Sequence, residues 1–76
     1  MWQEQDNQLI REFTFSDFKS ALAFVNQVGA LAETEQHHPD IELGWGRVKV
    51  SLTTHDQGGV TDKDRSLSSK IDALKI

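Results

Sequence analysis

Residues 47–54 read RVKVSLTT, and this stretch decides the fold. Apolar and polar side chains alternate along it, which is the period of a strand with one face buried and the other in water. Residues 41–43 can pair with it as a shorter strand, because Gly44-Trp45-Gly46 supplies flexible backbone for a turn between the two. The sequence therefore predicts a hairpin of two strands.

A long amphipathic helix is predicted before this hairpin, over residues 17–36. Ser16 is the expected N-cap and Asp17 lies in the expected first turn. Pro39 ends the helix, because proline lacks an amide hydrogen and disfavours helical geometry in the residue before it. The chain therefore leaves the helix at the pair His37-His38. The residues at helical spacing, which we expect to face the core, are Phe18, Ala21, Leu22, Val25, Val28 and Ala32.

Two further elements complete the pattern. A strand over residues 9–15 pairs with a short polar strand over residues 1–5 through a tight turn at Asp6-Asn7. After a loop at residues 56–59, Thr61 and Asp64 form a capping box that opens a last helix, which buries Leu67, Ile71 and Leu74. The order strand, strand, helix, strand, strand, helix predicts a single α+β domain over residues 1–76. We expect a four-stranded antiparallel sheet with both helices packed on one face.

Composition excludes several classes of function. The chain of 76 residues has no cysteine, so neither a disulfide nor a thiolate zinc site can strengthen its small core, and oligomerisation is the remaining route. The net charge of -4 argues against nucleic-acid binding. No apolar run approaches the roughly 20 residues of a membrane span and no leader is visible, so we expect a cytoplasmic protein without a membrane partner.

The histidines are the main functional signal, because all three fall between residues 37 and 55. His37 and His38 lie at the helix exit and His55 at the end of a strand, and these two places can meet at one edge of the sheet. Imidazole can give and accept protons near neutral pH, because its unperturbed pKa is about 6.5. Glu33 lies one helical turn before His37, so we expect its carboxylate to orient that ring.

Each of these features also has a simpler interpretation. Adjacent histidines are common at a polar helix end, and a glutamate one turn before a histidine is often a solvated surface pair. Trp45 is by default a core or interface aromatic, although it could stack on a flat heterocycle. Three histidines and Glu33 could bind zinc or iron, but neighbouring histidines at a helix break rarely aim at one ion. Gly58-Gly59 is better explained as a turn than as a phosphate loop.

The combined spacing resembles the pterin-4a-carbinolamine dehydratase family. The pattern is Glu33, three residues, then His37-His38-Pro39, followed by Trp45, His55 and Asp64, and the similarity covers nearly the whole chain. The resemblance implies a four-stranded antiparallel sheet backed by helices. Family members typically carry a further helix before the first strand, whereas this chain begins at Met1-Trp2, where that strand should start.

The resemblance also implies an activity, which is dehydration of a 4a-hydroxytetrahydropterin to quinonoid dihydropterin without metal or organic cofactor. His37, His38 and His55 would be the catalytic and substrate-contacting residues, with Glu33 supporting His37. Trp45 is a candidate wall of the pocket, and backbone groups near Thr53 and Thr54 are candidate partners for the pterin edge. Family members are commonly homodimers or homotetramers. Some relatives act instead as assembly partners of another protein, so a non-catalytic dimerisation module is the alternative.

Overall fold

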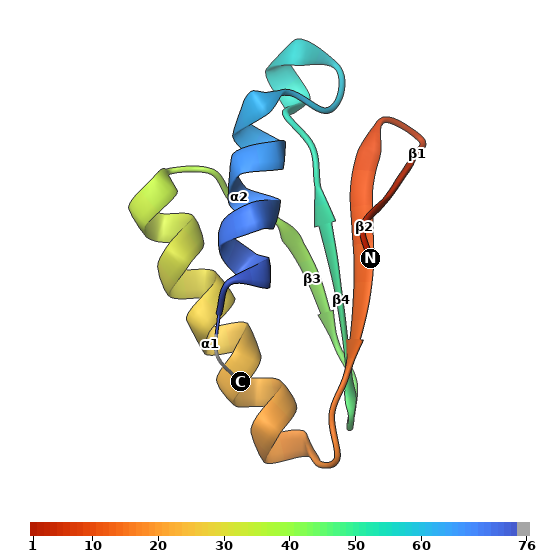
Figure 1. The fold of residues 1–76 in the computed structure, drawn as a ribbon, viewed down its shortest axis with the longest axis vertical. Coiled ribbons are helices and arrows are strands. Elements are labelled where there is room, and N and C mark those ends of the chain that lie inside the picture. Colours follow the sequence, from red (N-terminus) through yellow and green to blue (C-terminus); the bar gives the residue numbers. More distant parts are fainter. Residues whose placement is uncertain (75–76) are drawn as a thin grey trace.

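The computed structural model describes residues 1–74 and contains four strands and two α-helices. The strands form one antiparallel sheet in the order β1-β2-β4-β3, and both helices lie on the same side of it (Figure 1). This arrangement confirms the predicted α+β fold. The elements in chain order are β1 (Gln3–Gln5), β2 (Gln8–Thr14), α1 (Phe18–Glu35), β3 (Asp40–Leu43), β4 (Arg47–Leu52), the 3-10 turn η1 (His55–Gln57) and α2 (Asp62–Asp72).

The two hairpin turns form where the sequence predicts them. Asp6 and Asn7 both take left-handed backbone angles, with φ of 53° and 63°, as a two-residue turn that follows the twist of the sheet requires. At the β3–β4 turn the main chain of Gly46 lies against that of Phe15, whose amide donates to the Gly46 carbonyl oxygen at 2.8 Å. A Cβ on residue 46 would lie 2.7 Å from the Phe15 carbonyl oxygen, so this position requires glycine.

The core lies between the helices and the inner face of the two central strands. The registers of β2 and β4 place Leu9 opposite Leu52 and Phe13 opposite Val48. Phe24 of α1 packs against this layer, with its ring centroid 4.6 Å from that of Phe13. The buried cluster consists of Leu9, Ala21, Phe24, Val28, Val48, Val50, Leu52, Leu67 and Ile71. The alternation of β4 is confirmed by this burial.

The predicted core face of α1 is partly wrong. Phe24 is fully buried, whereas Phe18 and Leu22 are 44% and 39% exposed. The reason is that α1 carries apolar residues around most of its circumference, so that Phe18 and Leu22 define a stripe next to the one that faces the sheet. The N-cap is also shifted by one residue, because Asp17 and not Ser16 accepts from the Ser20 amide, at 2.7 Å.

Arg11 interrupts the apolar face of β2 without leaving its charge unpaired. Its guanidinium carbon lies 4.6 Å from the centre of the Phe13 ring, and Nη1 is 2.8 Å from the Asp72 carboxylate at the end of α2. The same Asp72 oxygen accepts from the Trp2 indole nitrogen at 2.9 Å. Asp72 therefore ties both N-terminal strands to the last helix. Within residues 1–74, no helix is long and apolar enough to cross a membrane.

Candidate active site

Three chain segments meet at one end of the molecule, at the top of Figure 1. They are the end of α1, the end of β4 with the η1 turn that follows it, and the beginning of α2. The end of α1 and the end of β4 lie at this same end of the sheet, so the histidines that follow them lie in the same region. This convergence is the one on which the sequence-based hypothesis depends.

The end of α1 determines where the two adjacent histidines go. Gln36 takes a left-handed conformation with φ of 53°, and its amide donates to the Glu33 carbonyl oxygen. The His37 amide donates to the Ala32 carbonyl oxygen at 3.1 Å, which completes a Schellman motif. The chain therefore turns sharply before His37, and neither histidine continues the helical spiral.

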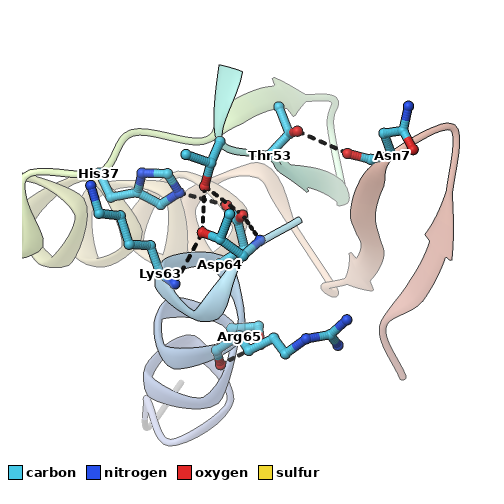
Figure 2. Close-up of polar contacts among 9 residues, drawn as sticks. Asn7, His37, Thr53, Lys63, Asp64 and Arg65 are labelled. Atoms are coloured by element: carbon cyan, nitrogen blue, oxygen red, sulfur yellow. Dashed lines mark hydrogen bonds and ion pairs between the residues drawn. The ribbon is translucent and has the colours of Figure 1, made fainter. Parts of the chain in front are cut away.

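His37 is held by Asp64, from the first turn of α2. Its Nε2 lies 2.5 Å from the Asp64 carboxylate, and Figure 2 shows the ring pointing at that group. The Asp64 side chain is fully buried and the His37 side chain is 13% exposed. The other Asp64 oxygen accepts from the Thr54 hydroxyl at 2.8 Å and from the Thr61 amide at 2.9 Å. One carboxylate thus joins α1, β4 and α2.

The Asp64 carboxyl is ionised at neutral pH. Burial by itself would raise its pKa, but hydrogen bonds from His37, the Thr61 amide and the Thr54 hydroxyl, together with the charge of His37, outweigh burial and lower the pKa below its ordinary value. A buried anion is therefore fixed against Nε2 of His37. When the ring is neutral, its hydrogen lies on this nitrogen because it faces the anion, and Nδ1 then carries the lone pair that can accept a proton.

The expected pairing of Glu33 with His37 is wrong. Glu33 contacts Nε2 of His38 instead, and the partner of His37 is Asp64. The i, i+4 spacing assumes that the helix continues to residue 37, whereas the left-handed turn at Gln36 carries His37 across to α2 and directs His38 back along α1. The Glu33 and His38 side chains are 72% and 58% exposed, so this pair lies in water.

All three histidines line one pocket of about 400 Å³, a volume within the range of small-molecule sites. Thr53 and Thr54, the candidate partners for the pterin edge, also line it. The Thr53 hydroxyl donates to the Asn7 carbonyl oxygen at 2.8 Å (Figure 2). The main chain of Thr54 is engaged with Gly59 and Gln57. Sequence reasoning missed three further lining residues, which are Gln36, Asp56 and Lys63.

Trp45 is not among the residues that line this pocket. It lies in the β3–β4 turn, at the opposite end of the sheet, and its side chain is 68% exposed. Within one chain it therefore does not form the expected wall. As for metal binding, no group of three or more His, Asp or Glu side chains in residues 1–74 is arranged to hold an ion.

Comparison with known proteins identifies the family. Residues 1–74 match the family described as pterin 4 alpha carbinolamine dehydratase. The chain belongs to the pterin-4a-carbinolamine dehydratase family. A relative from Chloroflexus aurantiacus, named "Putative pterin-4-alpha-carbinolamine dehydratase", is 45% identical over 96% of this chain and 78% of its own length. A relative of the same name from Metallosphaera sedula is 46% identical over 97% of this chain and 77% of its own length.

Two solved structures share the fold. A crystal structure described as a transcriptional coactivator/pterin dehydratase from Brucella melitensis superposes with a TM-score of 0.89 and 38% identity, over 95% of this chain and 79% of that one. A pterin dehydratase-like protein described as a RuBisCO assembly factor of the alpha-carboxysome gives a TM-score of 0.77 at 24% identity, over 96% and 84% of the two chains. The second likeness concerns the fold alone.

Proposed function

We propose that this protein dehydrates a 4a-hydroxytetrahydropterin to the quinonoid dihydropterin by acid–base catalysis with His37, His38 and His55. The observation that carries the proposal is the single pocket lined by all three imidazoles, one of them backed by a buried carboxylate. Pterin is a flat bicycle with polar edges, and the pocket volume suits a ligand of that size.

The reaction requires two proton transfers. The bond between C4a and the hydroxyl oxygen breaks as that oxygen receives a proton and leaves as water, and a ring nitrogen next to C4a loses its proton as the new double bond forms. Two imidazoles on different sides of the ring can share these steps, and positioned groups of this kind typically contribute about 10² to 10⁴ in rate.

His37 is suited to accept the ring proton. Its Nε2 is occupied by Asp64, so Nδ1 is the nitrogen that takes part. The ionised carboxylate offsets the positive charge that the ring acquires when it accepts a proton. His38, with Glu33, and His55 are then the candidates that deliver a proton to the leaving hydroxyl.

The main chain of Thr53 is the candidate partner for the polar edge of the pterin. The amide of Thr54 already donates to Gly59 at 3.0 Å, and its carbonyl oxygen accepts from Gln57 at 3.0 Å. Thr53 follows the last residue of β4, and its hydroxyl is fixed by Asn7. This leaves its backbone groups to meet the amide edge of the ligand.

Turnover of a 4a-hydroxytetrahydropterin generated in situ by a hydroxylase tests the proposal. We expect acceleration over the uncatalysed reaction, and a loss of about 10² or more on His37→Ala or His55→Ala. Thr34→Ala, an exposed change on α1, is the matched control and should leave the rate unchanged. Folded protein that gives no acceleration would contradict the proposal.

A second candidate function is that of an assembly module, as a homodimer or homotetramer or with another protein. Phe18 and Leu22 favour it, because they are exposed and lie one turn apart on α1, and adjoining exposed apolar side chains mark contact surfaces. Trp45 is a further exposed apolar side chain. The description of the Brucella melitensis relative as a coactivator also supports it. Sedimentation of Phe18→Glu and Trp45→Glu variants tests this candidate, since a subunit interface there should dissociate while pterin turnover stays measurable.

A further inference from the structure

The ammonium group of Lys63 makes no ion pair with a carboxylate in residues 1–74. Most lysine and arginine side chains in residues 1–74 are paired with a carboxylate, namely those of Arg11, Arg47, Lys49, Arg65 and Lys70. Lys63 and Lys19 have no such pair within that part of the chain. Lys63 lacks one although Asp62 and Asp64 are its neighbours in sequence.

The position of Lys63 does not favour a positive charge. It is the second residue of α2, after the N-cap Thr61, and the positive end of the helix dipole repels a cation there. Lys19 occupies the same position in α1, after the N-cap Asp17. The two lysines therefore have the same place in a helix and differ in what lies around them.

Lys63 lines the histidine pocket, and Lys19 does not. In Figure 2 its side chain extends from the start of α2 toward the end of α1, where His37 lies. Lys63 and His37 also border an adjoining hollow of about 310 Å³. The Lys63 side chain thus lines the same pocket as the ring that we assign to proton transfer.

Most other polar side chains of the pocket already have partners. The hydroxyl groups of Thr53 and Thr54 donate to Asn7 and Asp64, and the Gln36 amide donates to the Glu33 carbonyl oxygen. Lys63 is therefore a donor that is still available to a ligand. An ammonium group can only donate, so it selects a ligand atom that can only accept.

The 4-carbonyl oxygen is such an atom in a pterin. It is attached to the carbon next to C4a, so a group that holds this oxygen lies close to the reacting centre and to the histidines. We propose that Lys63 donates a hydrogen bond to the 4-carbonyl oxygen of the bound pterin and so distinguishes 4-oxo pteridines from their 4-amino analogues. This inference rests on the proposed pterin site and names a residue that determines its specificity.

Equilibrium binding of a fluorescent 4-oxo pterin and of its 4-amino analogue, at a pH where both are uncharged, tests the inference. A hydrogen bond from an exposed cation should make the wild-type protein prefer the 4-oxo ligand by about tenfold. Lys63→Met should weaken binding of the 4-oxo ligand by about that factor and leave the 4-amino analogue unaffected. Lys63→Arg should restore part of the preference, because it keeps the charge and the donors.

Lys19→Met is the control, because it removes a lysine from the same helical position outside the pocket. It should change neither affinity. An equal loss for both ligands, or no loss for either, in Lys63→Met would overturn the inference while wild-type turnover still supports the dehydratase. Preference without any turnover would overturn the dehydratase and leave the role of Lys63 intact. A wild-type protein that binds neither ligand would overturn the inference, and wild-type turnover would still decide the dehydratase.

Discussion

Replacing Asp64 with Asn should remove the negative charge of the side chain and keep its size. Of the groups that Asp64 contacts, the Thr61 amide can only donate, so the Asn oxygen must face it at the present 2.9 Å. The Asn amide nitrogen then faces Nε2 of His37, where a carboxylate oxygen now lies at 2.5 Å. Two donors would meet there unless the His37 ring moves its hydrogen to Nδ1. The substitution therefore forces the other tautomer.

The cost in stability follows from the contacts that change. Asn keeps an acceptor for Thr61 and Thr54, so the loss is that of one buried, charged hydrogen bond, about 1.5 to 3 kcal/mol. A chain of 76 residues typically has a total stability of roughly 4 to 11 kcal/mol, so Asp64→Asn should still fold. Its activity should fall by about 10² to 10⁴, because Nδ1 of His37 can no longer accept a proton.

The stability loss should depend on pH in a defined direction. The pKa of Asp64 is lower in the folded protein than its ordinary value of 3.8, so the native state favours the ionised carboxylate. The resulting stabilisation is fully present above about pH 3.8 and is lost as the pH falls through the lower folded value. The difference in unfolding free energy between wild type and Asp64→Asn should therefore shrink below that pH.

Urea unfolding followed by tryptophan fluorescence, at neutral and acid pH, measures this difference. Nitrogen NMR of the His37 ring identifies the tautomer in each protein. Thr34→Ala serves again as the exposed control. Equal stability of the two proteins at pH 7, together with an unchanged His37 tautomer, would refute the role assigned to Asp64.

Five further substitutions test the fold. Phe24→Ala should cost about 3 to 5 kcal/mol in urea unfolding because the ring is fully buried, whereas Phe18→Ala should cost clearly less because that side chain is 44% exposed. Gly46→Ala should lower the urea midpoint because its Cβ would meet a carbonyl oxygen at 2.7 Å, and Gly29→Ala, with open space around it in a helix, should raise stability by about 0.5 to 1 kcal/mol. Asp17→Ala should lower the thermal midpoint at neutral pH, with the loss fading below pH 3.8, because a hydrogen bond from Ser20 lowers the pKa of this carboxyl.

The elements that local pattern controls were predicted well. The alternation of residues 47–54 identified β4, and Asp6-Asn7 identified a turn, because each signal depends on neighbours in sequence. The face of α1 was predicted less well. Its apolar residues surround the helix, so the sheet and α2 decide which of them are buried, and that choice depends on distant parts of the chain.

In the candidate site too, local features were predicted and a contact with a distant part of the chain was missed. Spacing alone brought His37, His38 and His55 to one place, because a helix end and a strand end are local features. The partner of His37 was missed, since Asp64 lies 27 positions away. The capping-box pattern identified Asp64 as a helix signal and the family spacing included it, but neither assigned it as the partner of His37. A buried carboxylate with a second, distant donor has no signature in a single sequence.

The first turn of α2 links the stability of the fold to the geometry of the site. Asp64 caps this helix through the Thr61 amide and holds His37 with its other oxygen, while Lys63 presents its amine to the same pocket from the preceding position. Successive residues of a helix point about 100° apart, so one rigid turn directs one side chain inward and the next toward the ligand. Fraying of this turn would release His37 and displace Lys63 together. The capping box at Thr61 therefore supports the proposed chemistry as directly as it supports the helix.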